Sequence, residues 1–248
     1  MCERWRTVAH KYYRPLSETQ CFAIMQKTLK AIETHKLPES TTESDVFGWC
    51  DAVHLDDDQR YVRFVTRKTL WNVDVKQLVD LSWTIYSDGD LFKKHHLGGN
   101  CELFLHVLQR FSPDMMVVQC VEKYPALVQM THSLYLIFRV ETETEHMIAC
   151  RSIESSRLQS LMKAEGLSSS RNFFWDTFEV AHRDAQGKCG AVRFTLAGSI
   201  GSDNPTYAKR ASDEILIALV RSEIQVRDAS VLTIEEDCGA ARTASLSL

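Results

Sequence analysis

The sequence of 248 residues contains no long hydrophobic run. Its longest strongly apolar stretch is Ile215–Val220, far short of the roughly 20 residues that span a bilayer, so we expect no transmembrane segment. Residues 1–16 lack the apolar core that a secretory signal contains. We therefore expect a cytoplasmic protein, with the nucleus as an alternative location.

Paired cysteines are absent as well. The eight cysteines include no C-x-x-C pair, which excludes the common zinc-ribbon and thioredoxin-like spacings. A chain of this length needs no disulfide framework to fold, so we expect the cysteines to be reduced. The adjacent His95 and His96 lack a third ligand at a suitable spacing, and Asp56–Asp58 lacks the glycine and glutamate of a calcium loop. We therefore predict no metal site and no cofactor.

A strong excess of one charge is also missing. The chain has 29 Lys and Arg against 33 Asp and Glu, and its formal net charge is −4. This balance argues against a uniformly basic nucleic-acid binder. Residues 1–36 are locally basic, with seven Lys or Arg and three acids. This segment is either a solvated helix face or a contact for an anionic surface, and we favour the solvated face.

What the sequence does contain is a clear order of segments with different composition. A basic, helix-like stretch comes first and a polar stretch follows it. A body rich in alternating apolar residues comes next, and small and polar residues end the chain. We assign these segments as a helical extension (1–36), a linker (37–45), a globular domain (46–227) and a disordered tail (228–248).

The helical extension has an amphipathic pattern. Phe22, Met25, Leu29 and Ile32 are spaced 3, 4 and 3 residues apart, which predicts a helix over about 17–35. Two heptads are too few for a coiled coil that is stable alone. The helix therefore either packs on its own domain or pairs with a protein partner, and the spacing leaves both readings open.

The globular domain is dominated by β-strand patterns. Alternating apolar residues and tight polar turns, such as Asp56–Asp58 and Ser112–Asp114, predict mainly antiparallel pairing. A helical period occurs at 72–86 and again, over a shorter stretch, at 155–164, whereas Lys93–His96 is predicted to be a polar loop. The predicted strands are 46–55, 60–70, 101–111, 115–123, 130–141, 145–153, 172–182 and 188–199.

The last predicted element is a long apolar helix. It begins with Pro205 in its first turn and runs to about Arg227. Its apolar arc covers about two thirds of its circumference, so other elements must enclose it. A curved antiparallel sheet wrapped around this helix, with helices segregated to the ends, defines an α+β fold. Such an arrangement leaves a space between helix and sheet that suits an apolar ligand.

The chain resembles a known family in several stretches: Trp5–Ala9, Tyr61–Val65, and Leu105–Phe111 leading into Met115–Val121. Together with the strand–turn–strand–helix order at the C-terminus, they resemble a START-like domain of the helix-grip (Bet v 1-like) superfamily. More specifically, they resemble the mating-specific START-like proteins of oomycetes. The resemblance covers most of residues 1–226. It implies a helix-grip fold that binds a lipid or another hydrophobic molecule without catalysing a reaction.

From this we predict a non-catalytic lipid-binding module and no enzyme. The alternative is a regulatory protein that acts through the basic N-terminal helix on a protein or nucleic acid. In related chains that helix often continues a basic leucine-zipper-like segment, but here Pro15 interrupts it, so nucleic acid is not an expected partner. An enzyme built in the same cavity is a third hypothesis, and its scattered histidines and acids match no motif.

The sequence also suggests which residues line the space between helix and sheet. The same residues would serve equally well to fill a solid core, because protein interiors pack densely. Arg139 and Arg193 lie within apolar strands, where each either binds a carboxylate or phosphate headgroup or points to solvent. The apolar candidates are Trp83, Phe104, Tyr135, Ile137, Phe174, Trp175, Phe194, Ile215 and Leu219.

Overall fold

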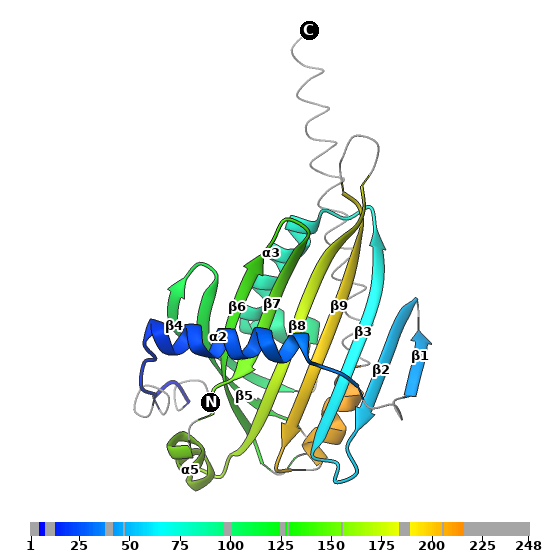
Figure 1. Ribbon diagram of the computed structural model, residues 1–248. Helices are drawn as coiled ribbons and strands as arrows, with labels where there is room; N and C mark the ends of the chain where they lie inside the picture. Colours follow the sequence, from blue (N-terminus) through cyan, green and yellow to red (C-terminus); the bar gives the residue numbers. More distant parts are fainter. Residues whose placement is uncertain are drawn as a thin grey trace, which may run out of the picture.

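The architecture is a curved sheet with helices on both faces. The computed structural model describes residues 5–7, 13–37, 42–46, 48–96, 101–124, 127, 129–154, 156–183, 189–204 and 206–215. Within these residues nine strands form one sheet, in the order β1-β2-β3-β9-β8-β7-β6-β5-β4 (Figure 1). Neighbours in this order pair antiparallel, and β6 and β8 add a short parallel contact. The predicted curved antiparallel sheet and α+β class are therefore confirmed.

Tight turns join many of the successive strands. At the tip between β2 and β3, the Asp56 N–H donates to the Tyr61 carbonyl at 2.9 Å, and the Asp58 carboxylate accepts from the Arg60 N–H at 3.1 Å. The acidic run is thus a hairpin tip, as predicted. The strands are β1 (Thr42–Val46), β2 (Trp49–Leu55), β3 (Tyr61–Trp71), β4 (Glu102–Ser112), β5 (Met115–Lys123), β6 (Thr131–Glu141), β7 (Glu145–Ser152), β8 (Ser168–Arg183) and β9 (Cys189–Ser202).

The helices divide between the two faces of the sheet (Figure 1). On the convex face lies α2 (Glu18–Glu33). On the concave face lie α3 (Val75–Ser87), α4 (Gly89–His96) and a helical segment at 206–215. The short α5 (Ser156–Ala164) connects β7 to β8. The concave face, with its several covering helices, is therefore the place where a ligand could be enclosed.

The N-terminal helix α2 begins where the sequence predicts. The Ser17 hydroxyl accepts from the Gln20 N–H at 3.2 Å, and the Gln20 side chain accepts from the Ser17 N–H at 2.8 Å, which is a capping box. Met25, Leu29 and Ile32 then pack against the cluster on the convex face. The apolar stripe of this helix is therefore in contact with its own domain.

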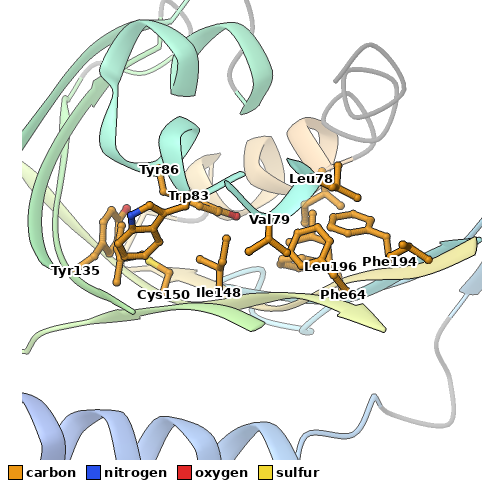
Figure 2. Close-up of a cluster of buried hydrophobic side chains, with 14 of the residues drawn as sticks. Phe64, Leu78, Val79, Trp83, Tyr86, Tyr135, Ile148, Cys150, Phe194 and Leu196 are labelled. Carbon is orange, nitrogen blue, oxygen red and sulfur yellow. The ribbon is translucent and has the colours of Figure 1, made fainter. Parts of the chain in front are cut away.

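Two hydrophobic clusters lie on opposite faces of the sheet. Figure 2 shows the concave cluster between the sheet and α3, with α2 on the far side. Strand β5 contributes to both clusters, because Val117 faces the convex side and Val118 the concave side. Every residue of β5 before Lys123 is buried for this reason. A strand that is covered on both faces has a nearly continuous apolar sequence.

The pairing of β3 with β9 joins distant parts of the chain. The Thr66 hydroxyl of β3 donates to the Leu196 carbonyl of β9 at 3.2 Å, across 130 residues. Next to this contact, Gly198 has φ +156°, and a Cβ there would lie 2.2 Å from the Phe173 carbonyl oxygen. This glycine therefore allows the backbones of β8 and β9 to approach closely.

Two predicted boundaries are wrong. Residues 42–45, predicted as part of a linker, form the edge strand β1 together with Val46, and this strand pairs antiparallel with β2. Lys93–His96, predicted as a polar loop, belongs to α4. This helix forms because the Asp88 carboxylate accepts from the N–H groups of Asp90 and Leu91, both at 2.9 Å. Asp88 is thus both the C-cap residue of α3 and the residue whose side chain caps the start of α4.

The C-terminal helix is described over residues 206–215. Its start agrees with the prediction, because the Asn204 side chain accepts from the Thr206 N–H at 3.0 Å. The predicted continuation to about Arg227 and the predicted tail, 228–248, lie outside the described residues.

Candidate functional site

A cavity of about 100 Å³ lies on the concave side, between the sheet and the helical segment 206–215. Strands β3, β8 and β9 supply much of its apolar wall, together with the helices on this face. A polar wall comes from β5 and its end, β6, β8 and the C-terminal segment. The apolar wall is Phe64, Tyr86, Phe92, Phe174, Leu196, Ile200, Ala211 and Ile215, and the polar wall is Glu122, Tyr124, Tyr135, Asn172, Tyr207 and Glu214.

Aromatic rings from the helices and the sheet meet at this cavity. The Tyr86 ring of α3 lies 6.0 Å from the Phe92 ring of α4 and 5.9 Å from the Phe174 ring of β8. Figure 2 shows Tyr86 pointing from α3 toward the sheet, where Tyr135 rises from β6. Rings at these separations contact each other favourably, so they form a shared wall between layers that are distant in sequence.

Beneath α3, the Tyr86 hydroxyl donates to Asp176 Oδ2 at 2.8 Å. Asp176 lies on β8 and is 3% exposed, and its other oxygen, Oδ1, has no hydrogen-bond partner among the described residues. Burial raises the pKa of Asp176 to about 7, although the hydrogen bond from Tyr86 opposes this rise. The core below the cavity therefore contains a carboxyl group that titrates near neutral pH.

Glu122 is the most hydrogen-bonded carboxyl of the polar wall. Its Oε2 accepts from the Tyr207 hydroxyl at 3.0 Å, and its Oε1 accepts from the Cys120 thiol at 3.4 Å. Burial raises the pKa of Glu122, and the nearby Glu214 carboxylate adds to the rise, while the hydrogen bonds from Tyr207 and Cys120 lower it. This group joins β5 to the C-terminal helical segment.

Two other residues of the polar wall each have one oxygen without a hydrogen-bond partner among the described residues. Asn172 donates from Nδ2 to the Tyr135 hydroxyl at 2.7 Å, but its Oδ1 has no partner. Glu214 accepts from Arg210 at Oε1, at 2.7 Å, but its Oε2 has no partner. Both residues are 6% exposed. Buried polar atoms normally have hydrogen-bond partners, so these two oxygens point to a missing group.

The predicted apolar candidates divide into three groups. Tyr135, Phe174 and Ile215 line the cavity. Trp83, Ile137 and Phe194 lie in the concave cluster but outside the cavity wall. Leu219 lies outside the described residues.

For Phe104 and Trp175, the prediction that they line this space is wrong. Both belong to the cluster on the convex face, where Trp175 contacts His35 at 5.0 Å between ring centroids. The cause is the alternation of side chains along a strand: Phe174 points to the concave face, so its neighbour Trp175 must point to the other. Leu103 and Phe104 divide in the same way on β4.

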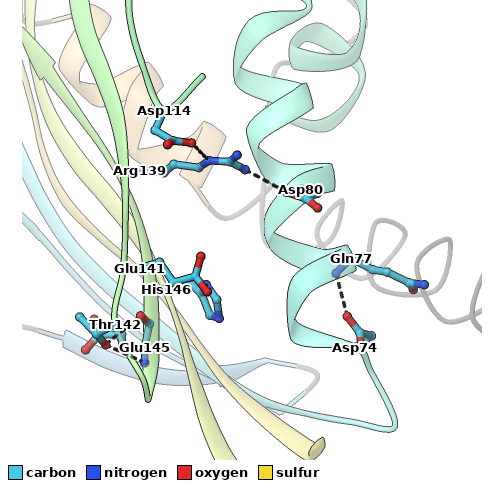
Figure 3. A network of polar contacts seen from close by, with 9 residues as sticks. All are labelled: Asp74, Gln77, Asp80, Asp114, Arg139, Glu141, Thr142, Glu145 and His146. Carbon is cyan, nitrogen blue, oxygen red and sulfur yellow. Dashed lines mark hydrogen bonds and ion pairs between the residues drawn. The ribbon is translucent and has the colours of Figure 1, made fainter. Parts of the chain in front are cut away.

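The two predicted headgroup-binding arginines are already engaged elsewhere. Arg139 forms ion pairs with Asp80 of α3, at 2.9 Å, and with Asp114 (Figure 3). Its guanidinium also lies 5.4 Å from the Trp83 ring centroid. Arg193 pairs with Glu179 at 2.8 Å, and both side chains are about half exposed. Neither arginine lines the cavity. Arg139 instead ties α3 to the sheet, and Arg193 belongs to the outer surface.

Apart from Tyr135, the residues of the polar wall were not predicted from the sequence. Glu122 shares its strand parity with Val118 and Cys120, which face the concave cluster, so its position in β5 was a usable signal. Glu214 lies three residues after Ala211, on the apolar arc of the C-terminal helix. Acids inside an apolar pattern are the signal that could have found both.

The described residues form neither a metal-binding cluster nor a membrane-spanning helix. Among the described residues, no three His, Cys, Asp or Glu side chains are grouped so that they could hold a metal ion. In the same residues, no helix has the length and apolar character needed to cross a membrane.

The fold described above is that of the START (StAR-related lipid transfer) domain. Human StAR-related lipid transfer protein 5 matches with a TM-score of 0.57 and 10% identity, over 88% of this chain and 99% of that one. Human STARD10 matches with a TM-score of 0.54 and 11% identity, over 95% and 88%. A STAR-related lipid transfer protein from Xanthomonas axonopodis matches at 0.50 and 15%, over 76% and 99%.

At such low identities this similarity shows the fold alone. No protein-family model matches the chain, and no curated protein matches it.

Proposed function

We propose that this protein binds a lipid or another hydrophobic small molecule, without catalysing a reaction, in the cavity on the concave face. The observation that carries the proposal is the cavity itself, with a mostly apolar wall and a few convergent polar groups. The START fold supports it, since two of the matching solved structures, the human and the Xanthomonas axonopodis StAR-related proteins, are named as lipid transfer proteins.

The size of the cavity sets a condition on binding. Small-molecule pockets usually measure roughly 300–1,000 Å³, whereas this cavity measures about 100 Å³. A lipid must therefore enlarge the cavity on entry, by moving side chains of the wall or the helical segment 206–215 that covers it. Ala211 and Ile215 lie on that segment and contact the cavity, so the covering element itself takes part in the site.

Organic extraction of the purified chain, followed by mass spectrometry, tests the proposal. We expect an apolar molecule in near-stoichiometric amount, and we expect Ala211→Phe to lower that amount by filling the cavity. Lys209→Phe is the matched control, because Lys209 is exposed on the same helical segment. An empty extract, together with no uptake of added hydrophobic probes, contradicts the proposal.

The narrower assignments are also proposals. Membership of the mating-specific START-like proteins of oomycetes, within the Bet v 1-like superfamily, is supported by the sequence stretches quoted above. A cytoplasmic or nuclear location is proposed as well.

The alternative reading, a regulatory protein that acts through the basic N-terminal helix, concerns residues 17–35. Their apolar stripe packs on the sheet, so a protein partner would have to bind the outer side of α2, where Phe22 is exposed.

A further inference from the structure

The polar wall of the cavity has a consistent hydrogen-bonding character. Among the described residues, Asn172 Oδ1 and Glu214 Oε2 are acceptor atoms without hydrogen-bond partners, and both residues line the same cavity. The two residues belong to different elements of its wall, β8 and the C-terminal helical segment. A buried acceptor without a donor destabilises the empty form, and a ligand that supplies a donor removes this penalty.

The charges around the cavity have one sign. Among the described residues that line it, two are carboxylic acids, Glu122 and Glu214, and none is Lys, Arg or His. Arg210 lies outside this wall, where it pairs with Glu214 Oε1 and its guanidinium lies 5.6 Å from the Tyr124 ring centroid. An anionic headgroup would therefore enter a buried space with two acids and no facing cation, at a high desolvation cost.

Glu122 does not compete for the same donor. Its two oxygens already accept from Tyr207 and Cys120. A donor from the ligand would consequently go to Glu214 Oε2 or Asn172 Oδ1.

From these contacts we infer that the hydrophobic ligand carries a hydrogen-bond donor that binds Glu214 Oε2 or Asn172 Oδ1, and that carboxylate and phosphate lipids are rejected. The donor is a hydroxyl, which can donate to one of the two oxygens, or a protonated amine, which can donate to both. This inference rests on the proposed function, because it specifies the ligand of the same cavity. A hydroxyl supplies one neutral donor, whereas a protonated amine adds attraction to the Glu214 carboxylate. The two share the donor, and the experiment separates them.

The test uses three probes with one hydrocarbon chain: 1-decanol, decylamine and decanoate. Calorimetric titration of the full-length chain at pH 7 measures the three dissociation constants, with the amine protonated and the acid ionised. We expect decanol or decylamine to bind at least about tenfold more tightly than decanoate. Tighter decylamine assigns a role to the Glu214 charge, and tighter decanol assigns the hydrogen bond alone.

Variants locate the selectivity. Glu214→Gln keeps the shape of the side chain but removes its charge and offers an amide donor, so we expect it to bind decanoate more tightly relative to decylamine. Glu179→Gln is the matched control, since Glu179 pairs with Arg193 on the outer surface, and it should leave the three constants unchanged. Circular dichroism confirms that each variant is folded.

The outcomes separate the two levels of the proposal. Equal binding of the three probes, or a preference for decanoate, overturns the donor inference and leaves hydrophobic binding in place. A wild-type preference that Glu214→Gln and Glu179→Gln both retain also overturns it, because the selectivity then comes from elsewhere. Absence of binding for all three probes overturns the proposed function and the inference with it.

Discussion

Asp176 provides the sharpest test of the structure, because a single substitution should change how stability depends on pH. The carboxyl lies under α3, accepts a hydrogen bond from Tyr86 and is 3% exposed. Asp176→Asn keeps the side-chain volume and the acceptor for Tyr86, but it removes the titrating group. The variant therefore isolates the cost of placing a negative charge in this core.

The sign and size follow from the pKa. Burial raises the pKa of Asp176 from 3.8 to about 7 in the folded protein. Between these two values the folded state binds more protons than the unfolded state, so stability falls as pH rises through this window. Each pH unit costs about 1.4 kcal/mol, which gives a total of about 4 kcal/mol. Between pH 5 and pH 8 the loss is roughly 3 kcal/mol, and it is complete above the folded pKa.

Urea unfolding at several pH values between 5 and 8 measures this effect. The difference in unfolding free energy, wild type minus Asp176→Asn, should fall by roughly 3 kcal/mol across the series. Asp203→Asn is the control, because the Asp203 side chain is 75% exposed. A flat difference curve for Asp176→Asn would refute the reasoning, since it would mean that the carboxyl titrates alike in both states.

Three further predictions concern packing and the two faces of the sheet. Gly198→Ala should lower the free energy of unfolding by about 3 kcal/mol, because its Cβ would overlap the Phe173 carbonyl. Gly166→Ala should lower it by only about 1 kcal/mol, because a Cβ there would have no atom within 4 Å. Chemical denaturation measures both. Arg139→Met should cost about 1 kcal/mol, because its ion pairs with Asp80 of α3 and with Asp114 are partly exposed, and a thermal melt measures this loss. Removal of residues 1–37 should expose the convex cluster, with increased binding of a hydrophobic dye; unchanged dye binding would contradict the packing of α2.

The sequence predicts the elements of this fold better than their edges. Period-two alternation and turn residues locate most of the strands, and the spacing of Met25, Leu29 and Ile32 locates α2, because these signals are local. The prediction of a linker at 42–45 was wrong because an edge strand with one neighbour needs no apolar pattern. Helix α4 was not predicted because Asp88 is ambiguous: Asp favours both turns and helix N-cap positions.

The site was harder to predict than the fold. An alternating pattern shows that two neighbouring side chains face opposite ways, but it does not show which face is concave, and Phe174 and Trp175 were both assigned to the same one. Glu122, Asn172 and Glu214 were missed because they meet only when β5, β8 and the C-terminal segment pack together. An acid inside an apolar pattern marks Glu122 and Glu214 one at a time, but no local pattern shows that segments so distant in sequence come together.

The seam between β3 and β9 has a consequence for how this chain is made. Within the described residues, β3 has hydrogen-bonded neighbours on both sides, β2 from the same end of the chain and β9 from 130 residues later. At about 5–20 residues per second, a ribosome takes between roughly 7 and 26 s to add that length. During this interval the β1–β3 unit has a long unpaired edge, which is a natural substrate for chaperones that hold nascent chains. Synthesis rate and chaperone supply should therefore govern the yield of folded protein more strongly than a change in the cavity does.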